Sequence, residues 1–347
     1  MTGGNRWEPG PDDLAVLEAE HRARVGAQDP LVAVPDLGAG PGAGELLAVR
    51  LPDGSRAAGV LTAGDVGPGA AAAMFRPLRE HRLRARAAGP DVPAAVAALL
   101  AAWAARVDAD PGVAPDGDGV AQVGPAPRDH GMVLLWPSRD VEAVAALAAH
   151  GMRPTVHLAA RRGTGRRDAV GGGPVGVTVR DATSDDVAAV LEHQLAELAY
   201  DELVGAARVR PRAREHLATQ VAGAVANPAT TFLVGTTASD APGGGRDVVV
   251  GAVAVEPPQR SGAVAGTVTA GPVAYLVLLH VTATARGAGV GGALVDAALA
   301  RVRARVGEHA VVLLHHGVLN PLSAPFWARQ GFRPVLTTWE RPVGRTG

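Results

Sequence analysis

The sequence predicts a protein built from two similar α/β domains. Its 347 residues are enough for two domains of ordinary size, and 47% of them are hydrophobic, which supplies two cores. An acidic helix start at residues 12–18 recurs at residues 185–192, and the Gly-Met-Arg-Pro of residues 151–154 recurs as Gly-Phe-Arg-Pro at residues 331–334. The two ends of one block thus reappear in the other, which indicates an internal duplication.

A glycine-rich segment separates the two blocks. Arg161–Gly176 is first basic and then carries three successive glycines and a proline, a composition typical of linkers. We therefore expect a first domain over residues 1–160, a linker over residues 161–174 and a second domain over residues 175–347.

Hydrophobic periodicity gives the order of elements in the second block. It opens with a strand, and the helix that follows starts at Thr183 or Ser184, where a hydroxyl can cap it and the acidic pair Asp185 and Asp186 favours its positive end. Apolar or alternating runs then predict strands, and runs with helical spacing predict helices. The predicted strands cover residues 176–180, 231–236, 248–255, 273–281, 310–315 and 334–339, and the further helices cover residues 211–226, 291–306 and 323–330.

The first block repeats the later part of this order. A helical pattern opens it at residues 12–18. Further along, we expect a helix over residues 93–107, a strand over 132–136, a helix over 141–149 and a strand over 154–160, with a long loop over 108–131.

Composition and charge exclude several classes of function. The 33 basic and 34 acidic residues nearly cancel, so we expect no nucleic-acid partner. The absence of cysteine excludes disulfides, thiolate metal sites and a cysteine nucleophile, and it fits a reducing bacterial cytoplasm. Residues 1–13 lack the apolar stretch of an export signal, and the longest uncharged run, residues 261–285, is broken by glycines and a proline. We therefore expect a cytoplasmic protein with no membrane segment and no metal.

A glycine-rich turn lies between the strand at 273–281 and the helix at 291–306. Residues 286–292 read Arg-Gly-Ala-Gly-Val-Gly-Gly, so the chain can turn tightly with its backbone N–H groups uncovered at a helix start. A phosphate or pyrophosphate is the natural ligand, and an ordinary strand-to-helix turn is the alternative. A Rossmann dinucleotide site is disfavoured, because the next strand ends in His315 and His316 where that fold needs an acidic residue.

Two patterns in the second block occur together at a familiar spacing. The first consists of residues 278–281 and the glycine turn, and the second consists of Asn320, Ser323, Phe326, Trp327, Gly331 and Phe332. In both patterns the block resembles the GNAT superfamily of acyl-CoA-dependent N-acyltransferases. The resemblance implies two GNAT-like domains, each with a mixed, mostly antiparallel sheet flanked by helices, and with splayed central strands in the C-terminal one.

The resemblance also implies acetyl-CoA as the acyl donor and assigns residues to its binding. The Val281 N–H would face the thioester carbonyl, where a donor stabilises developing negative charge. Asn320 would contact the pantetheine or cap the last helix. The pyrophosphate would contact Arg286 and the amides of Gly287, Ala288, Gly289, Val290, Gly291 and Gly292.

Acid and base catalysts are less clearly marked. Many family members have a tyrosine seven residues after the asparagine to protonate the leaving thiolate, but this chain has Trp327 there, which we expect to line the slot. Since an indole N–H is no usable acid near neutral pH, Ser323 or a water would supply the proton, or the thiolate would leave without one. The candidate bases for the amine are His280, His315 or His316, and Glu256.

The first block has lost these features. Aligned with the glycine turn, it has Asp91 where Gly291 stands, and Pro90 and Pro93 remove backbone donors. Asp140 stands opposite Asn320. We therefore expect the first block to be a degenerate repeat without a cofactor site. It would pack against the active copy and form one wall of the acceptor groove.

The leading hypothesis is an N-acyltransferase that moves an acetyl or other acyl group directly from acetyl-CoA to an amine. The acceptor is a small molecule or a peptide, and a homo-oligomer is left open. A non-catalytic acyl-CoA-binding or regulatory protein is the alternative, because Trp327 replaces the usual acid and no base is obvious. A nicotinamide-dependent dehydrogenase is a distant third.

Overall fold

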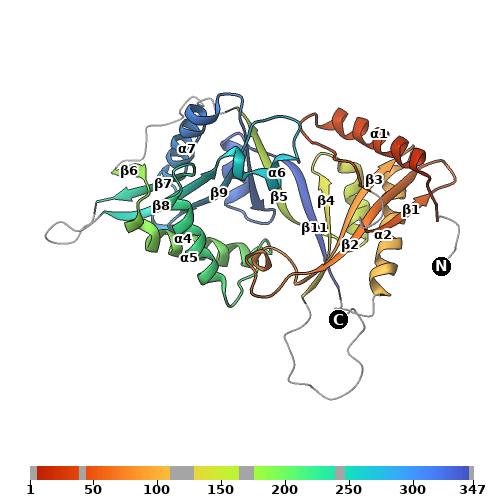
Figure 1. Ribbon diagram of the computed structural model, residues 1–347, viewed down its shortest axis with the longest axis horizontal. Helices are drawn as coiled ribbons and strands as arrows, with labels where there is room; N and C mark the ends of the chain where they lie inside the picture. Colours follow the sequence, from red (N-terminus) through yellow and green to blue (C-terminus); the bar gives the residue numbers. More distant parts are fainter. Residues whose placement is uncertain (1–5, 39–43, 110–128, 164–175, 239–246, 344–347) are drawn as a thin grey trace, which may run out of the picture. The chain divides into compact units, whose positions relative to one another are not determined.

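The computed structural model describes residues 6–38, 44–109, 129–163, 176–238 and 247–343 (Figure 1). Parts of the predicted linker and of the predicted loop over 108–131 lie outside these ranges. The chain forms two compact units. Unit 1 comprises Met1–His157 and Val335–Gly347, and unit 2 comprises Leu158–Pro334.

Unit 1 contains a sheet in the order β1-β2-β3-β4-β11. Neighbouring strands are antiparallel except for β3 and β4, which are parallel. The elements are α1 (Pro11–Gln28), β1 (Glu45–Arg50), β2 (Arg56–Asp65), β3 (Arg79–Ala88), α2 (Val92–Asp108), β4 (His130–Pro137), α3 (Val144–Ala149) and β11 (Arg333–Pro342), with β5 (Arg153–Arg162) crossing into unit 2.

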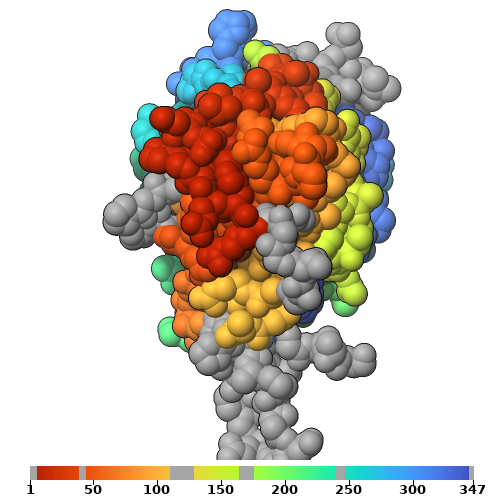
Figure 2. All heavy atoms as spheres, turned by 90° about the vertical axis from the view of Figure 1, so that its right-hand side faces the viewer, coloured from red at the N-terminus to blue at the C-terminus, as the bar shows by residue number. Residues whose placement is uncertain are grey.

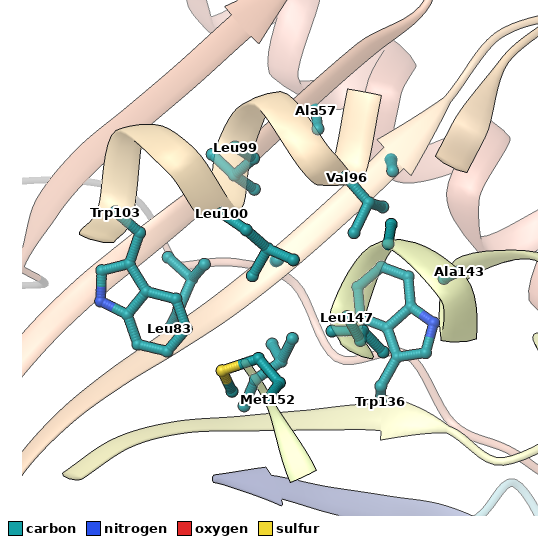
Figure 3. Packing of buried hydrophobic residues seen from close by; sticks show 14 of the residues in the cluster. Ala57, Leu83, Val96, Leu99, Leu100, Trp103, Trp136, Ala143, Leu147 and Met152 are labelled. Atoms are coloured by element: carbon teal, nitrogen blue, oxygen red, sulfur yellow. The ribbon is translucent and has the colours of Figure 1, made fainter. Parts of the chain in front are cut away.

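The core of unit 1 lies between α2 and the sheet. Trp103 of α2 and Trp136 of β4 are fully buried or nearly so, and they pack with Leu83, Leu100 and Met152 (Figure 3). Burial of such large apolar side chains is the main stabilising contribution to this unit. Figure 2 shows its surface, with the side chains of α1 in red and those of α2 in gold.

Unit 2 contains a sheet in the order β10-β9-β8-β7-β6, in which only β9 and β10 are parallel. Its elements are β6 (Val177–Asp181), α4 (Val187–Leu203), α5 (Ala213–Ala226), β7 (Thr231–Thr237), β8 (Val248–Glu256), α6 (Gly262–Ala265), β9 (Val273–Val281), α7 (Val290–Val306), β10 (Val311–Gly317) and α8 (Ser323–Arg329). Alternate residues of β7 and β8 pack against α7 on one face and against α4 and α5 on the other (Figure 1).

The predicted fold class is confirmed, and most predicted elements of the second block are present. The strand predicted at 273–281 is β9, and the helix predicted at 291–306 is α7, which starts one residue earlier. Thr183 forms a capping box with Asp186 ahead of α4, as the acidic start suggested. The sequence analysis missed β1, β2 and β3 of the first block.

The predicted boundary between the domains needs a correction. The sequence analysis assigned residues 1–160 to the first domain and 175–347 to the second, but the structure groups 335–347 with unit 1 and 158–163 with unit 2. The physical reason is strand pairing. β11 pairs antiparallel with β4 of unit 1, while the end of β5 lies beside β10 of unit 2, where Gly163 N donates to Ala310 O. The last strand of each block thus completes the sheet of the other unit.

The two units share one order of elements. In each, a helix precedes three antiparallel strands, a helix and a parallel strand. The isolated bridge between Arg6 and Val49 takes the place of the first strand, β6, of unit 2. This correspondence supports the internal duplication.

The two helices that follow the long strands begin differently. In unit 1 only residues 89–91 join β3 to α2, and Gly89 has a φ of +114°. The Asp91 carboxylate accepts a 2.9 Å hydrogen bond from Ala94 N and so caps the helix. In unit 2 a longer turn, residues 282–289, precedes α7, whose start has no side-chain cap. The helix start is therefore already occupied in unit 1 and free in unit 2.

We expect Asp91→Ala to lower the free energy of unfolding of unit 1 by about 1 kcal/mol, because the Ala94 N–H loses its acceptor. Asp91→Asn keeps an acceptor and is the matched control, with less than half of that loss. Urea unfolding followed by tryptophan fluorescence measures the effect, since Trp7, Trp103, Trp136 and Trp339 lie in unit 1 and Trp327 alone in unit 2. An unchanged midpoint in Asp91→Ala would contradict the capping role.

Candidate functional site

The strands β9 and β10 separate part-way along their length. They pair over four positions, from Val273 opposite Val311 to Leu276 opposite Leu314, and beyond this point residues 278–281 pair only with β8. The opening contains a cavity of about 300 Å³. The splayed strands inferred from the resemblance are therefore present.

A β-bulge sets which side chains face each side of this opening. The register shifts between Ala254 and Val255, so that Val277 is an extra residue on β9. Beyond it, Leu278 packs in the cluster beneath α4 and α5, whereas Leu279 and Val281 pack towards α7. His280 shares the α4 face with Leu278, because alternate residues of a strand point to the same face.

The backbone of β9 presents free donors to the opening. Thr282 N donates to Val250 O, so that in this antiparallel ladder the alternate residues His280 and Leu278 bond to β8. The N–H groups of Val281 and Leu279 consequently point away from β8. The Val281 carbonyl accepts a 3.1 Å hydrogen bond from Arg286 Nε, which holds the start of the glycine turn against the strand.

The glycine turn leads directly into α7. Gly287 and Gly289 have φ values of +82° and +83°, a backbone region that favours glycine. A Cβ at Gly291 would lie 3.3 Å from the Phe326 ring, so that glycine allows α7 and α8 to approach closely. Arg286, Gly287 and Gly291 line the cavity. Uncapped N–H groups and the positive end of the helix dipole make this turn a suitable anion site.

Asn320 and Trp327 have structural roles at the other wall. Asn320 Oδ1 accepts hydrogen bonds of 3.0 Å from Leu322 N and Ser323 N, so it caps α8. Trp327 is 7% exposed and packs edge-on against Phe326 and Phe332. Both residues, together with Ser323, line the cavity. Trp327 therefore belongs to the wall, as its indole chemistry suggested.

Two imidazoles meet on the α4 face of the cavity. His280 Nδ1 lies 2.7 Å from His193 Nδ1, and His193 Nε2 lies 3.2 Å from Val249 O. Burial, then the neighbouring His193 and Arg286, lowers the pKa of His280 to about 4. Burial likewise lowers the pKa of His193. Both rings are consequently neutral near pH 7.

A second polar pair lies at the point where the strands part. Tyr275 Oη lies 2.7 Å from His315 Nδ1. Burial raises the pKa of Tyr275, and burial followed by His316 lowers the pKa of His315 to about 4. The phenol is therefore protonated and the imidazole neutral at physiological pH. His316 also lines the cavity, and its Nδ1 lies 3.2 Å from Gly317 O.

The sequence analysis missed the acidic residues of α4 that line the cavity. Burial, and then the neighbouring Asp201, raises the pKa of Glu197 well above its ordinary value. Burial also raises the pKa of Asp201, while the hydrogen bond from Asn320 Nδ2 at 3.4 Å lowers it. His193, Glu197 and Asp201 are spaced by four residues, which places them on one helix face. This spacing is the sequence signal that could have found them.

Glu256 does not line this cavity and is corrected as a candidate base. It lies at a smaller neighbouring cavity between α4, α5 and the sheet, where its carboxylate forms a 3.4 Å ion pair with Arg260. The other predicted catalytic residues, His280 and Ser323, do line the main cavity. Of the predicted cofactor-binding residues, Ala288, Gly289, Val290 and Gly292 belong to the turn and the helix start without lining it.

The described part of the chain contains neither a group of metal ligands nor a helix that could span a membrane. No three histidine or acidic side chains in the described ranges are grouped as a metal site requires. None of the described helices combines the length and hydropathy needed to cross a membrane.

Comparison with known families decides the classification. Residues 193–332 match the sequence profile described as the acetyltransferase (GNAT) family. The segment 193–332 is a GNAT-family domain. This segment contains most of α4, the parting strands, the glycine turn and α8, which are the elements that form the cavity. A search of curated proteins found no match.

Solved structures similar to this chain include a GCN5-related N-acetyltransferase from Sphaerobacter thermophilus, at 14% identity and a TM-score of 0.53, covering 97% of this chain and 95% of that one. This likeness supports the fold alone. A tandem GNAT protein from the clavulanic acid biosynthesis pathway, without AcCoA, has 16% identity, covers 99% of both chains and has a TM-score of 0.42. A GCN5-related N-acetyltransferase from Kribbella flavida has 17% identity, covers 84% of this chain and 87% of that one, and has a TM-score of 0.38.

We expect Glu197→Gln to stabilise the protein at pH 7. Because the pKa of Glu197 is raised by folding, the folded state binds more protons than the unfolded state, and the unfolding free energy falls as pH rises between the two pKa values. The gain is about 1.4 kcal/mol for each unit by which the pKa is raised, and it disappears at a pH below the unfolded value.

Thermal unfolding by calorimetry at pH 4 and pH 7 measures this difference. The exposed Glu308 supplies the control, since Glu308→Gln removes the same charge from the surface of unit 2. A Glu197→Gln protein less stable than wild type at pH 7 would show that the carboxylate is stabilised by folding.

Proposed function

We propose that this chain is an N-acyltransferase that transfers an acyl group from an acyl-CoA, acetyl-CoA in the first instance, to an amine. The observation that carries the proposal is the combination of two features at one place. An uncapped glycine turn lies at the mouth of an opening between two parallel strands, and polar groups line the far side of that opening. The GNAT-family domain at residues 193–332 supports the same activity.

The residues of unit 2 fit the chemistry of an acyl-CoA. A pyrophosphate needs several donors and a positive charge, which the amides of Gly287, Ala288, Gly289, Val290, Gly291 and Gly292 and the Arg286 guanidinium would supply. The pantetheine arm is narrow and carries amides, so it suits an opening with unpaired backbone groups. Asn320 would act on it indirectly, by holding the start of α8 at the wall.

The N–H groups of Val281 and Leu279 are the donors that face this arm. A donor fixed at the thioester carbonyl stabilises the negative charge that develops on its oxygen during attack, and it does so without reorganisation because the strand is rigid. We assign this role to Val281 with Leu279 beside it. The acyl donor supplies an activated thioester, and the protein supplies the preorganised dipoles.

Proton transfer at the leaving group does not depend on Trp327. Ser323, at the start of α8, carries a hydroxyl that lines the cavity and could relay a proton to the thiolate, directly or through a water. The alternative that the protein binds acyl-CoA without catalysis follows from this same tryptophan, and turnover measurements decide between them.

The acceptor side of the cavity suits an amine. Neutral imidazoles at His280 and His315 can accept a proton, and the carboxyl groups of Glu197 and Asp201 lie on the same helix face. We propose a small-molecule or peptide amine as the acceptor. It would approach from α4, opposite the α7 side from which the pyrophosphate is held.

Unit 1 is proposed to have no acyl-CoA site. Its strands β3 and β4 also part, after Leu83 and Leu134. We propose that nearby side chains fill this opening. His21 Nδ1 lies 3.1 Å from Ala87 O, and Arg24 donates to Asp140, which also accepts from Trp136 Nε1. With Asp91 capping α2 as well, an anion has neither free donors nor space.

Release of free CoA tests the activity. We expect at least one member of a panel of amines to accelerate thiol release from acetyl-CoA in the presence of the protein, detected with a thiol reagent and confirmed by mass spectrometry of the acylated amine. Binding of CoA without release for any amine would favour the non-catalytic alternative, and absence of CoA binding would overturn both.

Substitution of the turn tests the anion site. We expect Gly289→Asp and Gly291→Asp each to weaken CoA binding by tenfold or more in titration calorimetry, because a carboxylate at the helix start repels the pyrophosphate and caps its donors, as Asp91 does in unit 1. The control is Gly262→Asp, on α6, where an added Cβ meets nothing within 4 Å. A stoichiometry of two CoA per chain would contradict the assignment of unit 1.

A further inference from the structure

The two imidazoles on the α4 face form a chain of hydrogen bonds that ends on the backbone. His193 is buried, at 6% exposure, and lies between the Val249 carbonyl and the ring of His280. The His193 and His280 rings are nearly perpendicular, at 71°, with centroids 4.9 Å apart. Both ring nitrogens of His193 are therefore engaged, one by the backbone and one by His280.

The partners determine where the protons lie. A carbonyl oxygen only accepts, so His193 Nε2 must carry a hydrogen to bond with Val249 O. Because burial keeps His193 neutral, its Nδ1 then has a lone pair and no hydrogen. The hydrogen between the two Nδ1 atoms, 2.7 Å apart, consequently belongs to His280. A neutral His280 with its hydrogen on Nδ1 has a bare lone pair on Nε2.

The bare Nε2 atom belongs to a ring that lines the cavity. Within the described residues it makes no hydrogen bond, and it is not among the buried polar atoms that lack one. The charged and titratable groups around it come from two elements. Arg286 lies on the glycine turn. His193 lies on α4, and Glu197 lies one turn further along that helix. The residue that faces His280 on β8 is the uncharged Ala252.

We propose that His193 is a positioning residue that fixes the tautomer of His280, so that His280 Nε2 is the atom that takes the proton of the acceptor amine. This inference rests on the proposed N-acyltransferase function. The observation behind it is the chain of two hydrogen bonds from Val249 O through His193 to His280, which leaves one basic nitrogen on a ring that lines the cavity.

The transfer balances with this single base. The amine nitrogen attacks the thioester carbon and forms the C–N bond, and its proton passes to His280 Nε2. As that nitrogen gains the proton, the hydrogen on Nδ1 is shared with His193, which spreads the positive charge towards the Val249 carbonyl. The C–S bond then breaks with its electron pair on sulfur, and the proton on Nε2 passes to the thiolate, directly or through a water. The products are an amide and free CoA thiol.

This arrangement accounts for two features of the chain. A base with a low pKa suffices, because an amine nitrogen becomes strongly acidic once its bond to the carbonyl carbon forms. The proton held on His280 also reaches the leaving thiolate, so that no tyrosine is needed at the position of Trp327. The pair His193 and His280 thus accounts both for a base of low pKa and for the absence of a tyrosine at the position of Trp327.

Two substitutions at residue 193 test the inference. His193→Phe keeps a ring but removes the acceptor for His280 Nδ1–H, and we expect kcat for the best amine to fall by about tenfold to a hundredfold. His193→Asn restores an oxygen acceptor near the position of Nδ1, and we expect kcat within about threefold of wild type, since the tautomer of His280 is kept. The KM for acetyl-CoA should be unchanged in both variants, which also shows that they fold.

A spectroscopic measurement tests the tautomer without turnover. In ¹⁵N-histidine-labelled full-length protein, the resonances lost in His280→Asn identify His280. We expect its Nε2 to show the shift of a bare, pyridine-like nitrogen and its Nδ1 that of a protonated one, and we expect this pattern to average between tautomers in His193→Phe. The exposed His309 provides the control, since His309→Phe should change neither the His280 resonances nor kcat.

The outcomes separate this inference from the proposed function. A protonated Nε2 on His280, or wild-type kcat in His193→Phe, overturns the role of His193 even when the protein is an active acyltransferase. Absence of amine-dependent CoA release in the wild-type protein overturns the proposed function and the catalytic role together, whatever the tautomer. The expected tautomer with a kcat loss in His193→Phe and its recovery in His193→Asn supports the inference.

Discussion

The candidate site of unit 2 depends on one interruption in a ladder of sheet hydrogen bonds. After four paired positions β10 leaves β9, while β9 stays paired with β8 as far as Val281, with a bulge at Val277. Backbone donors left unpaired inside a protein are costly unless a partner satisfies them, so such an interruption persists only where something else can bind. The uncapped glycine turn, the capped start of α8 and the polar face of α4 all border this gap. The separation of the two strands thus creates the gap, and the surrounding side chains then determine its chemistry.

Unit 1 contains a similar interruption, between β3 and β4, where we propose that no acyl-CoA binds. There the chain supplies its own occupants, since His21 reaches the backbone of β3 while Arg24 and Trp136 share the fully buried Asp140. Burial, then Arg86 and Arg24, lowers the pKa of His21 to about 3, so the ring is neutral in the filled gap. The difference between the two units lies in what occupies the gap rather than in the topology.

Sequence reasoning found the elements whose signals are local. β9 is a continuous apolar run and α7 follows directly on glycines, and both were located to within one residue. β3 was missed because arginines interrupt its pattern, although Leu83, Ala85 and Ala87 alternate inwards. His193 was missed because its four-residue spacing to Glu197 and Asp201 indicates only a common helix face and does not identify its partners on the sheet. The pairing of β11 with β4 depends on contacts between distant segments, which no window of sequence contains.

The exchange of terminal strands has a consequence for synthesis on the ribosome. The sheet of unit 1 includes β11, which follows all of unit 2 in the chain, so its edge at β4 stays open until unit 2 has been translated. Unit 2 is continuous in the chain and can pair the end of β5 with β10 as soon as β10 is made. Unit 1 therefore cannot complete its sheet before unit 2 is made, and the nascent chain exposes an unpaired strand edge at β4 until β11 emerges.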